Sequence, residues 1–357
     1  MNLPATDPQP LLYVLHSSHL FGTERMALAT VRGLTDQFTP ILFGPPGEAM
    51  DLAEQLGFAA RRFRGAKEFA KVLRPELRQR RSLTFVATGV VQSAVCIALN
   101  LLYRRKINHI HIVHGGTDER GSFGRKKWLN HAPVTFVTVS DYARQRMIAH
   151  GVRADKIEVV TNFLPAEYLA AAPRRAAYTG GIANVLIVSR LDPMKRVELL
   201  LDALDRKPAE LRDLSFRILG LGPDMKPLAD RAARTHPNVT FAGFSADVPG
   251  ELAKSDLLLH TCPVEPFGLA ILEAMAANVA ALVPDQGGAS SLVEDQKNGF
   301  KFRANDPAHL AEKLIELKSA AAETLNRAVA GGRFAVEKTF SPQEGLDRYR
   351  RLFAPKA

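Results

Sequence analysis

Short apolar runs, many of them rich in β-branched residues, alternate along the chain with longer stretches in which apolar residues recur every three or four positions. The short runs predict strands and the longer stretches predict amphipathic helices, because side chains repeat every two residues on a strand and about every 3.6 residues on a helix. Regular alternation of the two is typical of a parallel sheet with right-handed crossovers and helices on both faces. The pattern therefore predicts an α/β, doubly wound architecture.

In the first half of the chain this pattern predicts a strand about every 20 to 28 residues, a spacing that leaves room for one crossover helix between strands. The expected strands are Leu11–His16, Thr39–Phe43, Ala59–Phe63, Leu83–Ala87, His109–His114, Val134–Val139 and Ile157–Thr161. The expected helices are Glu24–Thr35, Ala49–Leu56, Lys67–Arg80, Val90–Arg104 and Asp141–His150.

The alternation stops between Pro165 and Gly181, where Ala, Pro, Arg and Gly predominate without a clear period. Such a segment is typical of an interdomain linker. Beyond it, the expected strands are Asn184–Ser189, Ser215–Leu219, Val239–Ala242, Leu257–Thr261, Ala280–Pro284 and Gly299–Phe302. The expected helices are Arg196–Asp205, Met225–Thr235, Leu269–Ala277, Pro307–Ala320 and Pro342–Phe353.

Two consecutive doubly wound domains are therefore expected in the 357 residues. We predict an N-terminal Rossmann-like domain at residues 1–168, a linker at 169–182, a C-terminal Rossmann-like domain at 183–338 and a C-terminal helix at 339–357 that could pack back on the N-terminal domain. Ligands of such sheets bind outside the carboxyl ends of the strands. A cleft between the two facing domains is the expected ligand site.

The composition narrows the class and location of the protein. The two cysteines, Cys96 and Cys262, lie far apart without metal-type spacing, which excludes a disulfide framework and favours a reducing cytoplasm. The first residues lack the basic and apolar regions of a signal peptide. The longest apolar run, Gly89–Leu102, is shorter than the about 20 residues that a membrane span needs. A cytoplasmic location is expected.

The net charge of +10 lies mostly in the first half of the chain, in basic clusters within residues 61–81 and 104–127. Such a surface could attract an anionic membrane or a phosphate-bearing acceptor, which would place the protein on the inner face of the cytoplasmic membrane. A solvated basic face is the alternative that the pattern leaves open. Nucleic acid is disfavoured, because the clusters lack interleaved aromatic residues and a recognised binding motif.

Candidate chemistry begins with the basic residues Arg190 and Lys195, which follow an apolar strand of the second domain. The carboxyl end of such a strand is the ligand edge of a doubly wound sheet. A guanidinium offers a planar fork for phosphate oxygens and an ammonium offers a compact charge. The pair could neutralise a diphosphate, although a solvated basic turn explains the spacing equally well.

A second cluster runs from Glu265 through Phe267, Gly268 and Leu269 to Glu273, just after the strand that ends near Thr261. A helix is expected to begin near Leu269, so that its free amides and its dipole face an anion while Gly268 permits a close backbone approach. Glu273 lies about one turn inside an otherwise apolar helix, where a carboxylate needs a partner. The hydroxyls of a sugar or a ribose would be suitable partners.

Two weaker clusters lie in the first domain. Gly22, between the first strand and the first helix, would let backbone amides approach a phosphate. His114 ends a strand and precedes Gly115 and Gly116, so we expect it to face the ligand, with packing as the alternative; His109 is interpreted as polar surface.

The turn Gly220–Met225 partly imitates a dinucleotide fingerprint, but Met225 replaces the third glycine and the preceding strand is not the first of its domain. Gly222 and Pro223 are therefore interpreted as a tight turn beside a nucleotide. Metal-binding histidine, cysteine and Asp-x-Asp motifs and the G-x-S-x-G elbow do not occur in the sequence. Metal-assisted transfer is disfavoured, and no cofactor is expected.

Taken together in their order along the chain, these clusters resemble the retaining glycosyltransferases of family 4. The resemblance covers most of the chain, and an ordered set of motifs is more specific than any one of them. The segments that carry it are Gly22–Arg25, Val139–Asp141, Gly151-Val152, Lys156-Ile157, Thr161-Asn162, Arg190–Lys195, Leu219–Pro223, Glu265–Glu273, Gly287-Gly288 and Asn298–Phe300.

The resemblance implies a GT-B fold, a UDP- or GDP-sugar donor, retention of anomeric configuration and no bound metal. It implies that Arg190 and Lys195 stabilise the leaving diphosphate, and that Glu265 holds donor-sugar hydroxyls and Glu273 the ribose. It further implies that amides near Gly268 and Leu269 meet the sugar or phosphate. His114 would line the donor sugar, and Gly22 would let the acceptor domain close over the phosphate.

The acceptor is expected to be a saccharide or a lipid-linked saccharide, in assembly of cell-envelope polysaccharide or glycolipid. One departure from the family pattern is Ala277–Ala280, where Asn278 stands in place of the usual glycine and the following proline is missing. Asn tolerates a left-handed conformation, so the helix end can survive. A sugar-nucleotide epimerase of the same fold and a non-catalytic sugar-nucleotide-binding protein remain as alternatives.

Overall fold

The computed structural model describes residues 8–115 and 119–354. They form two compact units, one comprising the chain up to Asn162 together with the segment from Pro342 onward, and the other comprising Phe163–Ser341. The expected linker at 169–182 falls inside the second unit, where the helix α7 (Ala166–Ala171) overlaps its beginning. This helix lies in a segment whose sequence shows no clear period.

The first unit is built on a seven-stranded sheet in which all neighbouring strands pair in parallel. The strand order is β3-β2-β1-β4-β5-β6-β7. The strands are β1 (Gln9–Val14), β2 (Phe38–Gly44), β3 (Ala59–Arg62), β4 (Ser82–Ala87), β5 (Lys106–Val113), β6 (Val134–Thr138) and β7 (Ile157–Val159). From β1 the sheet extends to β2 and β3 on one side and to β4 through β7 on the other. The switch point of the sheet therefore lies between β1 and β4.

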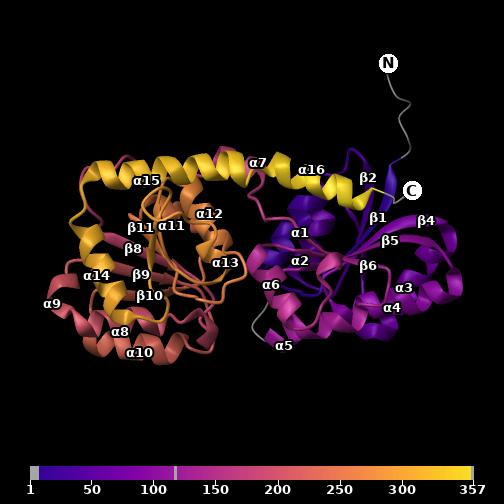
Figure 1. Ribbon diagram of the computed structural model, residues 1–357, viewed down its shortest axis with the longest axis horizontal. Coiled ribbons are helices and arrows are strands. Elements are labelled where there is room, and N and C mark those ends of the chain that lie inside the picture. The colour runs from indigo at the N-terminus through magenta and orange to yellow at the C-terminus, as the bar shows by residue number, and fades with distance from the viewer. Residues whose placement is uncertain (1–7, 116–118, 355–357) are drawn as a thin grey trace, which may run out of the picture. The chain divides into compact units, whose positions relative to one another are not determined.

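Helices cover both faces of this sheet (Figure 1). They are α1 (Gly22–Arg32), α2 (Glu48–Gln55), α3 (Gly65–Gln79), α4 (Val90–Tyr103), α5 (Glu119–Ser122), the 3₁₀ segments η1 (Gly124–Leu129) and η2 (Ala154–Lys156), α6 (Asp141–Ala149) and α16 (Pro342–Phe353). Phe69 and Leu73 of α3 and Cys96 of α4 share one apolar cluster with side chains of β1, β2 and β4. The helices α3 and α4 therefore lie together on one face of the sheet.

The last helix, α16, packs on the first unit. The Thr84 hydroxyl donates to the Phe353 carbonyl at 2.7 Å, and the Asn108 amide donates to the Leu352 carbonyl at 2.7 Å. The rings of Phe38 and Phe353 meet edge to face, with centroids 6.1 Å apart. These contacts tie the C-terminal helix to strands β2, β4 and β5, as the sequence reading allowed.

The second unit contains a six-stranded sheet, again parallel throughout, in the order β10-β9-β8-β11-β12-β13. Its switch point lies between β8 and β11. The strands are β8 (Asn184–Val188), β9 (Ser215–Leu219), β10 (Val239–Gly243), β11 (Leu257–Leu259), β12 (Ala280–Pro284) and β13 (Phe300–Phe302).

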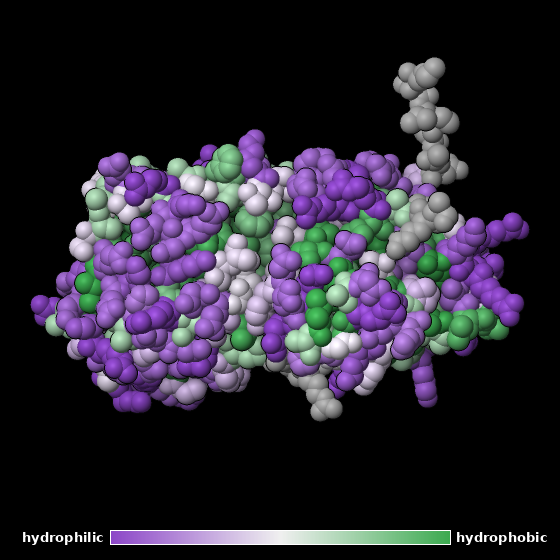
Figure 2. All heavy atoms as spheres, viewed as in Figure 1, coloured by the Kyte–Doolittle hydropathy of each residue, from purple (hydrophilic) through white to green (hydrophobic). Residues whose placement is uncertain are grey.

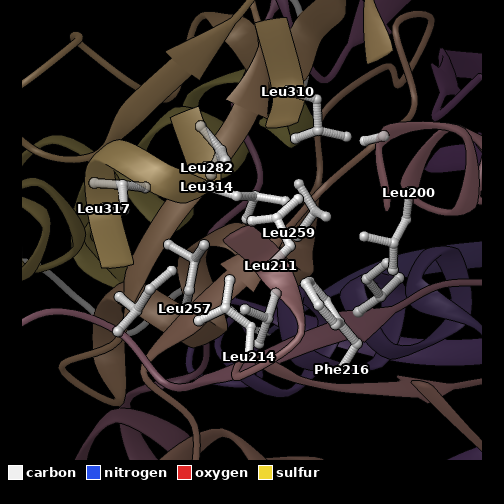
Figure 3. Packing of buried hydrophobic residues seen from close by; sticks show 14 of the residues in the cluster. Leu200, Leu211, Leu214, Phe216, Leu257, Leu259, Leu282, Leu310, Leu314 and Leu317 are labelled. Atoms are coloured by element: carbon white, nitrogen blue, oxygen red, sulfur yellow. The ribbon is translucent and has the colours of Figure 1, made fainter. Parts of the chain in front are cut away.

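Leucine side chains fill the core of this unit, as Figure 3 shows for Leu200, Leu257, Leu282 and Leu314. They come from helices and strands alike, so the sheet and its covering helices share one apolar cluster. The helices of the unit are α7, η3 (Pro193–Lys195), α8 (Glu198–Arg206), α9 (Pro208–Leu211), α10 (Met225–Thr235), α11 (Val248–Ala253), α12 (Leu269–Ala276), α13 (Gly287–Ser290), α14 (Pro307–Lys318), α15 (Ala322–Phe334) and the π-helical η4 (Ala335–Thr339).

The predicted doubly wound architecture is confirmed, and every predicted strand is present with shifts of a few residues at its ends. The sequence reading missed α15, whose Ala-rich pattern ends at Gly331 and Gly332, and the short helices α9, α11 and α13. The interpretation of His109 as polar surface is wrong: its ring is buried under α4, and its Nε2 lies 3.0 Å from the Ser93 hydroxyl. Within the described residues, none of the helices is both long and apolar enough for a membrane span.

Candidate active site

The candidate site of the second unit lies at its switch point, where the loops after β8 and β11 leave the carboxyl edge of the sheet. The first loop carries Arg190 and Lys195, and the second carries His260, Cys262 and Glu265. The Thr261 hydroxyl donates to the Lys195 carbonyl at 2.7 Å, and the Cys262 thiol donates to the Met194 carbonyl at 3.1 Å. These bonds hold the two loops against each other.

The two loops are also joined by an ion pair. The Lys195 ammonium lies 2.5 Å from Glu265 Oε2, with side chains only 19% and 16% exposed. Cation and carboxylate thus come from segments 70 residues apart in sequence. The structure brings together two of the residues that the sequence singled out separately.

Electrostatics keep both partners ionised. Burial alone would raise the pKa of Glu265, but the charge of Lys195 and its hydrogen bond, together with the charge of Arg190, outweigh burial, and the net shift is downward. Burial alone would lower the pKa of Lys195, but Glu265 reverses this and the net shift is upward. The site therefore keeps a fixed cation beside a fixed carboxylate at neutral pH.

Arg190 is the more exposed of the two predicted cations. Its guanidinium lies 2.7 Å from Asp192 Oδ2, and 48% of its side chain is exposed. It is near enough to lower the pKa of both Lys195 and Glu265 through its charge. The charges of Arg190 and Lys195 thus act on the same small region, with Lys195 fixed by its ion pair and Arg190 accessible to a ligand.

The turn after β9 packs against the Arg190 loop. Leu191 N–H donates to the Leu221 carbonyl at 3.0 Å, and Asp224 N–H donates to the Leu191 carbonyl at 3.0 Å. A Cβ at Gly222 would lie 2.1 Å from the Leu191 carbonyl oxygen, so this approach requires glycine. Gly222 and Pro223 themselves are exposed beside the loop. The predicted tight turn is present at this edge.

The loop after β11 leads into α12, which begins at Leu269. Gly268 precedes it with φ of 101°, a left-handed conformation that disfavours other residues. The helix start carries no side-chain cap in the described part of the chain, and Ile271 N–H donates to the Gly268 carbonyl at 3.0 Å. The amides of Leu269 and Ala270 are therefore the ones that can face an acceptor. Phe267 is buried against Phe340, and Glu273 is half-buried one turn inside the helix.

Gly287 and Gly288, at the end of β12, complete this edge of the sheet. Gly288 N–H donates to the Glu265 carbonyl at 2.6 Å. The loop that carries Glu265 is therefore held from two sides, by the Arg190–Lys195 segment and by the start of α13.

Two polar residues of this site were missed by the sequence reading. His260 and Cys262 directly follow the buried strand β11, and their only sequence signal is that position. Burial lowers the pKa of His260 to about 4, with Glu265 opposing and Lys195 assisting the shift. Its Nε2 is shielded from solvent without a hydrogen-bond partner among the described residues. His260 is therefore a neutral polar group beside the ion pair.

Ligand atoms of His260, Cys262 and Glu265 lie within 4.8 Å of one another, close enough for a metal ion. The Lys195 ammonium already occupies Glu265 Oε2. Burial also raises the pKa of Cys262 to about 11, which keeps the thiol protonated and a poor ligand. The donor set therefore fits a metal poorly while Lys195 is in place, and metal-independent transfer stays a prediction.

The switch point of the first unit carries a second polar cluster. His16, after β1, and Thr88, after β4, are joined by a 2.9 Å hydrogen bond between Nδ1 and Oγ1. Glu24, in the first turn of α1, is 1% exposed, and its Oε1 lies 3.9 Å from His16 Nδ1. Burial raises the pKa of Glu24 to about 7, against backbone hydrogen bonds at Glu24, Ser17 and Phe21 that lower it.

His114 follows β5 at the same edge. Burial, assisted by His16, lowers its pKa to about 3, and its Nε2 has no hydrogen-bond partner among the described residues. Gly115 adopts φ of 87°, and Gly116 lies outside the described residues. Gly22 is the exposed first residue of α1. The sequence reading placed His114 and Gly22 at this edge but missed Glu24 and His16 as its buried polar core.

The predicted site residues thus form one group in each unit. In the second unit, Arg190, Lys195, Glu265 and the start of α12 meet at one switch point, and this arrangement can hold an anion between cations and helix amides. In the first unit, His114 and Gly22 lie with His16 and Glu24 at the other switch point. Neutral groups of this kind can exchange hydrogen bonds with hydroxyls.

Comparison with known families accounts for most of the chain. Residues 22–168 match the family described as Glycosyltransferase Family 4, and residues 180–333 match the family described as Glycosyl transferases group 1. Among curated proteins, the chain is 30% identical to a phosphatidyl-myo-inositol mannosyltransferase of Mycobacterium leprae, over 51% of this chain and 49% of that protein.

A second relative is a poly(ribitol-phosphate) alpha-N-acetylglucosaminyltransferase of Staphylococcus aureus, 24% identical over 70% of this chain and 50% of that protein. A third is an N-acetyl-alpha-D-glucosaminyl L-malate synthase of Bacillus anthracis, 27% identical over 46% of this chain and 44% of that protein. The chain is thus matched over about half the length of these curated relatives.

Solved structures agree on the fold. The Anabaena protein HepE in complex with UDP and glucose superposes with a TM-score of 0.80 at 20% identity, covering 96% of this chain and 98% of that one. The lipopolysaccharide outer core galactosyltransferase WaaB superposes with a TM-score of 0.75 at 15% identity, covering 96% of this chain and 98% of that one. The two family matches and the two parallel-sheet units both indicate a glycosyltransferase of GT-B fold. The chain therefore belongs to the family 4 and group 1 glycosyltransferases.

Proposed function

We propose that this protein is a retaining glycosyltransferase that transfers a hexose from a nucleoside-diphosphate sugar to a saccharide or lipid-linked acceptor. The observation that carries the proposal is the Lys195–Glu265 pair at the second unit's switch point, with Arg190 and the uncapped start of α12 beside it. Its curated relatives are named as mannosyl- and N-acetylglucosaminyltransferases, which supports this class of reaction.

The donor diphosphate fits the charges of the second unit. Lys195 stays protonated because Glu265 raises its pKa, and Arg190 has an accessible fork for phosphate oxygens. Amides at an uncapped helix start add further donors for an anion. Preorganised donors of this kind stabilise charge that develops on a leaving group, because they need no reorganisation during the reaction. UDP and GDP sugars are the donors proposed.

In the proposed reaction, the bond between the sugar anomeric carbon and the diphosphate oxygen breaks as the acceptor oxygen bonds to that carbon. The acceptor hydroxyl proton passes to the leaving phosphate, so no protein base is required. Glu265 would orient sugar hydroxyls, Glu273 the ribose, and Gly222 and Pro223 the nucleotide side. His114 and Gly22 would act from the first unit. Retention and independence from metal are parts of this proposal.

Two other functions fit the same fold. Neither a sugar-nucleotide epimerase nor a binding protein would need an acceptor. An exposed Arg190, paired with Asp192, beside the Lys195–Glu265 pair favours transfer, because it places accessible positive charge where the leaving group would develop negative charge.

The proposed acceptors include lipid-linked saccharides in glycolipid or cell-envelope polysaccharide assembly. The relative from Mycobacterium leprae is named for a lipid acceptor, phosphatidyl-myo-inositol, which supports this range. A peripheral location at an anionic membrane, through the basic first unit, is part of the same proposal.

A donor screen tests the function. The full chain is incubated with a panel of UDP- and GDP-hexoses, with and without EDTA, while thermal shift and release of UDP or GDP are measured. We expect one nucleotide series to raise the melting temperature and to be hydrolysed slowly in the absence of acceptor. Conversion of a donor to its epimer without nucleotide release would support the epimerase, and binding without any turnover would support the binding protein.

A further inference from the structure

The helix α4 presents an apolar face to solvent. Each of its exposed residues is apolar, and together they follow helical spacing along one side of the helix: Val91, Ala94, Ala98, Leu101 and Leu102. Leu101 and Leu102 are 76% and 73% exposed, and Val91 is 57% exposed. Its opposite side, with Ser93 and Cys96, is buried on the sheet. Single exposed apolar residues are common, but a contiguous apolar face indicates an interaction site.

Basic residues flank this face on the α3 side. Lys67, Lys71, Arg74 and Arg78 are exposed along one side of α3, which packs beside α4. Glu68 is the only exposed acidic residue on that helix. Figure 2 shows hydrophobic atoms reaching the surface between hydrophilic ones at the lower right, where Figure 1 places α3 and α4.

The segment η1 flanks α4 on its other side. Val90 and Ile97 of α4 pack with Phe123 and Leu129 at η1, whereas Val95 and Leu99 pack toward α3. The exposed residues of η1 are Arg125, Lys127 and Trp128, of which Trp128 is 69% exposed. An apolar strip thus lies between two basic flanks, one of which carries an exposed indole.

We propose that this surface, defined by α3, α4 and η1, docks the protein on an anionic lipid bilayer. The apolar residues of α4 would enter the boundary between headgroups and acyl chains, while the flanking lysines and arginines contact anionic headgroups. The indole of Trp128 suits the same boundary, because it is apolar with one polar end. Combined apolar and basic signals are what stable peripheral anchoring requires.

Charge distinguishes a bilayer from a second copy of the chain. A symmetric pairing of α4 faces would bring the basic flanks of both copies together, and like charges oppose such contact. An anionic bilayer can bury the apolar strip and neutralise the basic flanks at the same time. This inference rests on the proposed function, which includes a peripheral location at an anionic membrane, and names the surface of the first unit that makes the contact.

The single tryptophan of the sequence, Trp128, reports on docking directly. The full chain is mixed at low salt with vesicles of phosphatidylcholine alone or with about a third of phosphatidylglycerol, and tryptophan emission and co-sedimentation are measured. We expect a blue shift and co-sedimentation with the anionic vesicles, both weakened by high salt. Absence of both with anionic vesicles at low salt overturns the proposal.

Two variants test the surface. Leu101→Gln with Leu102→Gln should weaken binding to anionic vesicles about tenfold or more, because it removes the most exposed part of the strip. Lys71→Glu with Arg74→Glu should weaken it at least as much, since each basic residue near the surface contributes roughly fivefold. If the first variant loses its fold, Ala94→Gln with Ala98→Gln on the same face replaces it.

Matched controls lie in the second unit. Phe244→Gln with Phe334→Gln changes two equally exposed apolar residues, and Arg234→Glu with Lys254→Glu makes the same change of charge. Both should bind vesicles as the unaltered chain does. If the controls weaken binding as strongly as the α3 and α4 variants, the surface is wrongly assigned. If Leu101→Gln with Leu102→Gln splits a dimer in sedimentation velocity while vesicle binding persists, a second copy is the occupant and the proposal fails.

Nucleotide release from the donor identified above is measured on the same variants without lipid and should be unchanged. In these variants, loss of vesicle binding with intact release is the result expected of the proposed surface. In the unaltered chain, absence of vesicle binding with intact release is a failure of docking alone, whereas docking without release is a failure of the proposed function alone.

Discussion

The two units have the same kind of switch point but opposite electrostatics. In the first unit, the loops after β1 and β4 are joined by a neutral hydrogen bond between His16 and Thr88. In the second unit, the loops after β8 and β11 are joined by the ion pair of Lys195 and Glu265. The same sheet geometry therefore supports two different polar sites.

The difference is visible in the pKa of one buried carboxyl in each unit. Burial raises the pKa of Glu24 to about 7. Burial also lowers the pKa of the neighbouring His16, so this imidazole offers little positive charge to oppose the shift. Glu265 is buried too, yet the charge of Lys195 holds its pKa below the usual value. One site keeps a carboxyl that exchanges its proton near neutral pH, and the other keeps fixed charges. The first suits hydroxyl groups and the second suits a diphosphate.

The largest effect is expected from removing both cations of the second unit. Arg190→Ala with Lys195→Ala should lower donor turnover about a thousandfold or more, because both charges stabilise the leaving diphosphate. Release of UDP or GDP measures the loss. Lys254→Ala, an exposed lysine on the same unit, serves as the control and should leave turnover unchanged. Normal turnover in the double variant would remove the basis of the proposed mechanism.

The next effect concerns the free energy of unfolding. Loss of the Lys195–Glu265 ion pair should have a smaller but measurable effect. Lys195→Met leaves a buried carboxylate without its cation and should lower the free energy of unfolding by about 2–3 kcal/mol at pH 7. Adding Glu265→Gln should restore at least half of that loss, because the remaining charge is removed as well. Urea denaturation measures both. If the double variant instead lost the sum of the stability losses of the two single variants, the two side chains would not interact energetically.

Sequence periodicity predicted most of this architecture, because strand and helix periods are set by backbone geometry and burial. It also placed Arg190, Lys195 and Glu265 at strand ends. It could not predict that Lys195 pairs with Glu265, because that contact depends on how two loops fold across neighbouring strands. Glu24 was missed for a related reason: a carboxyl in the first turn of a helix usually faces solvent, and only the packed loop shows that it is buried.

The first unit's carboxyl predicts a pH-dependent stability. The pKa of Glu24 is 4.5 in the reference state and about 7 in the folded chain. Between these values the native carboxyl keeps a proton that the unfolded chain loses, so its contribution falls as pH rises through the folded pKa. Glu24→Gln should therefore stabilise the protein by about 1–3 kcal/mol at pH 8 and have little effect at pH 4.

Melting temperatures of the two proteins across this pH range check the prediction. Glu312→Gln, a change to an exposed glutamate inside α14, is the matched control and should shift stability little across the same range. A constant difference between Glu24→Gln and the unaltered chain would show that Glu24 has no shifted pKa.

The smallest effect concerns the end of α12, where the chain departs from the family pattern. Asn278 adopts φ of 60°, so the structure confirms that an asparagine can end this helix in the left-handed region. Glycine adopts that conformation without the strain that a Cβ causes. Asn278→Gly should therefore stabilise the fold by about 0.5 kcal/mol, measured by urea denaturation, with turnover unchanged. A large change in turnover would instead mean that the end of α12 positions the site residues. The charges of the second unit's site would then depend on this helix end as well as on the Lys195–Glu265 ion pair.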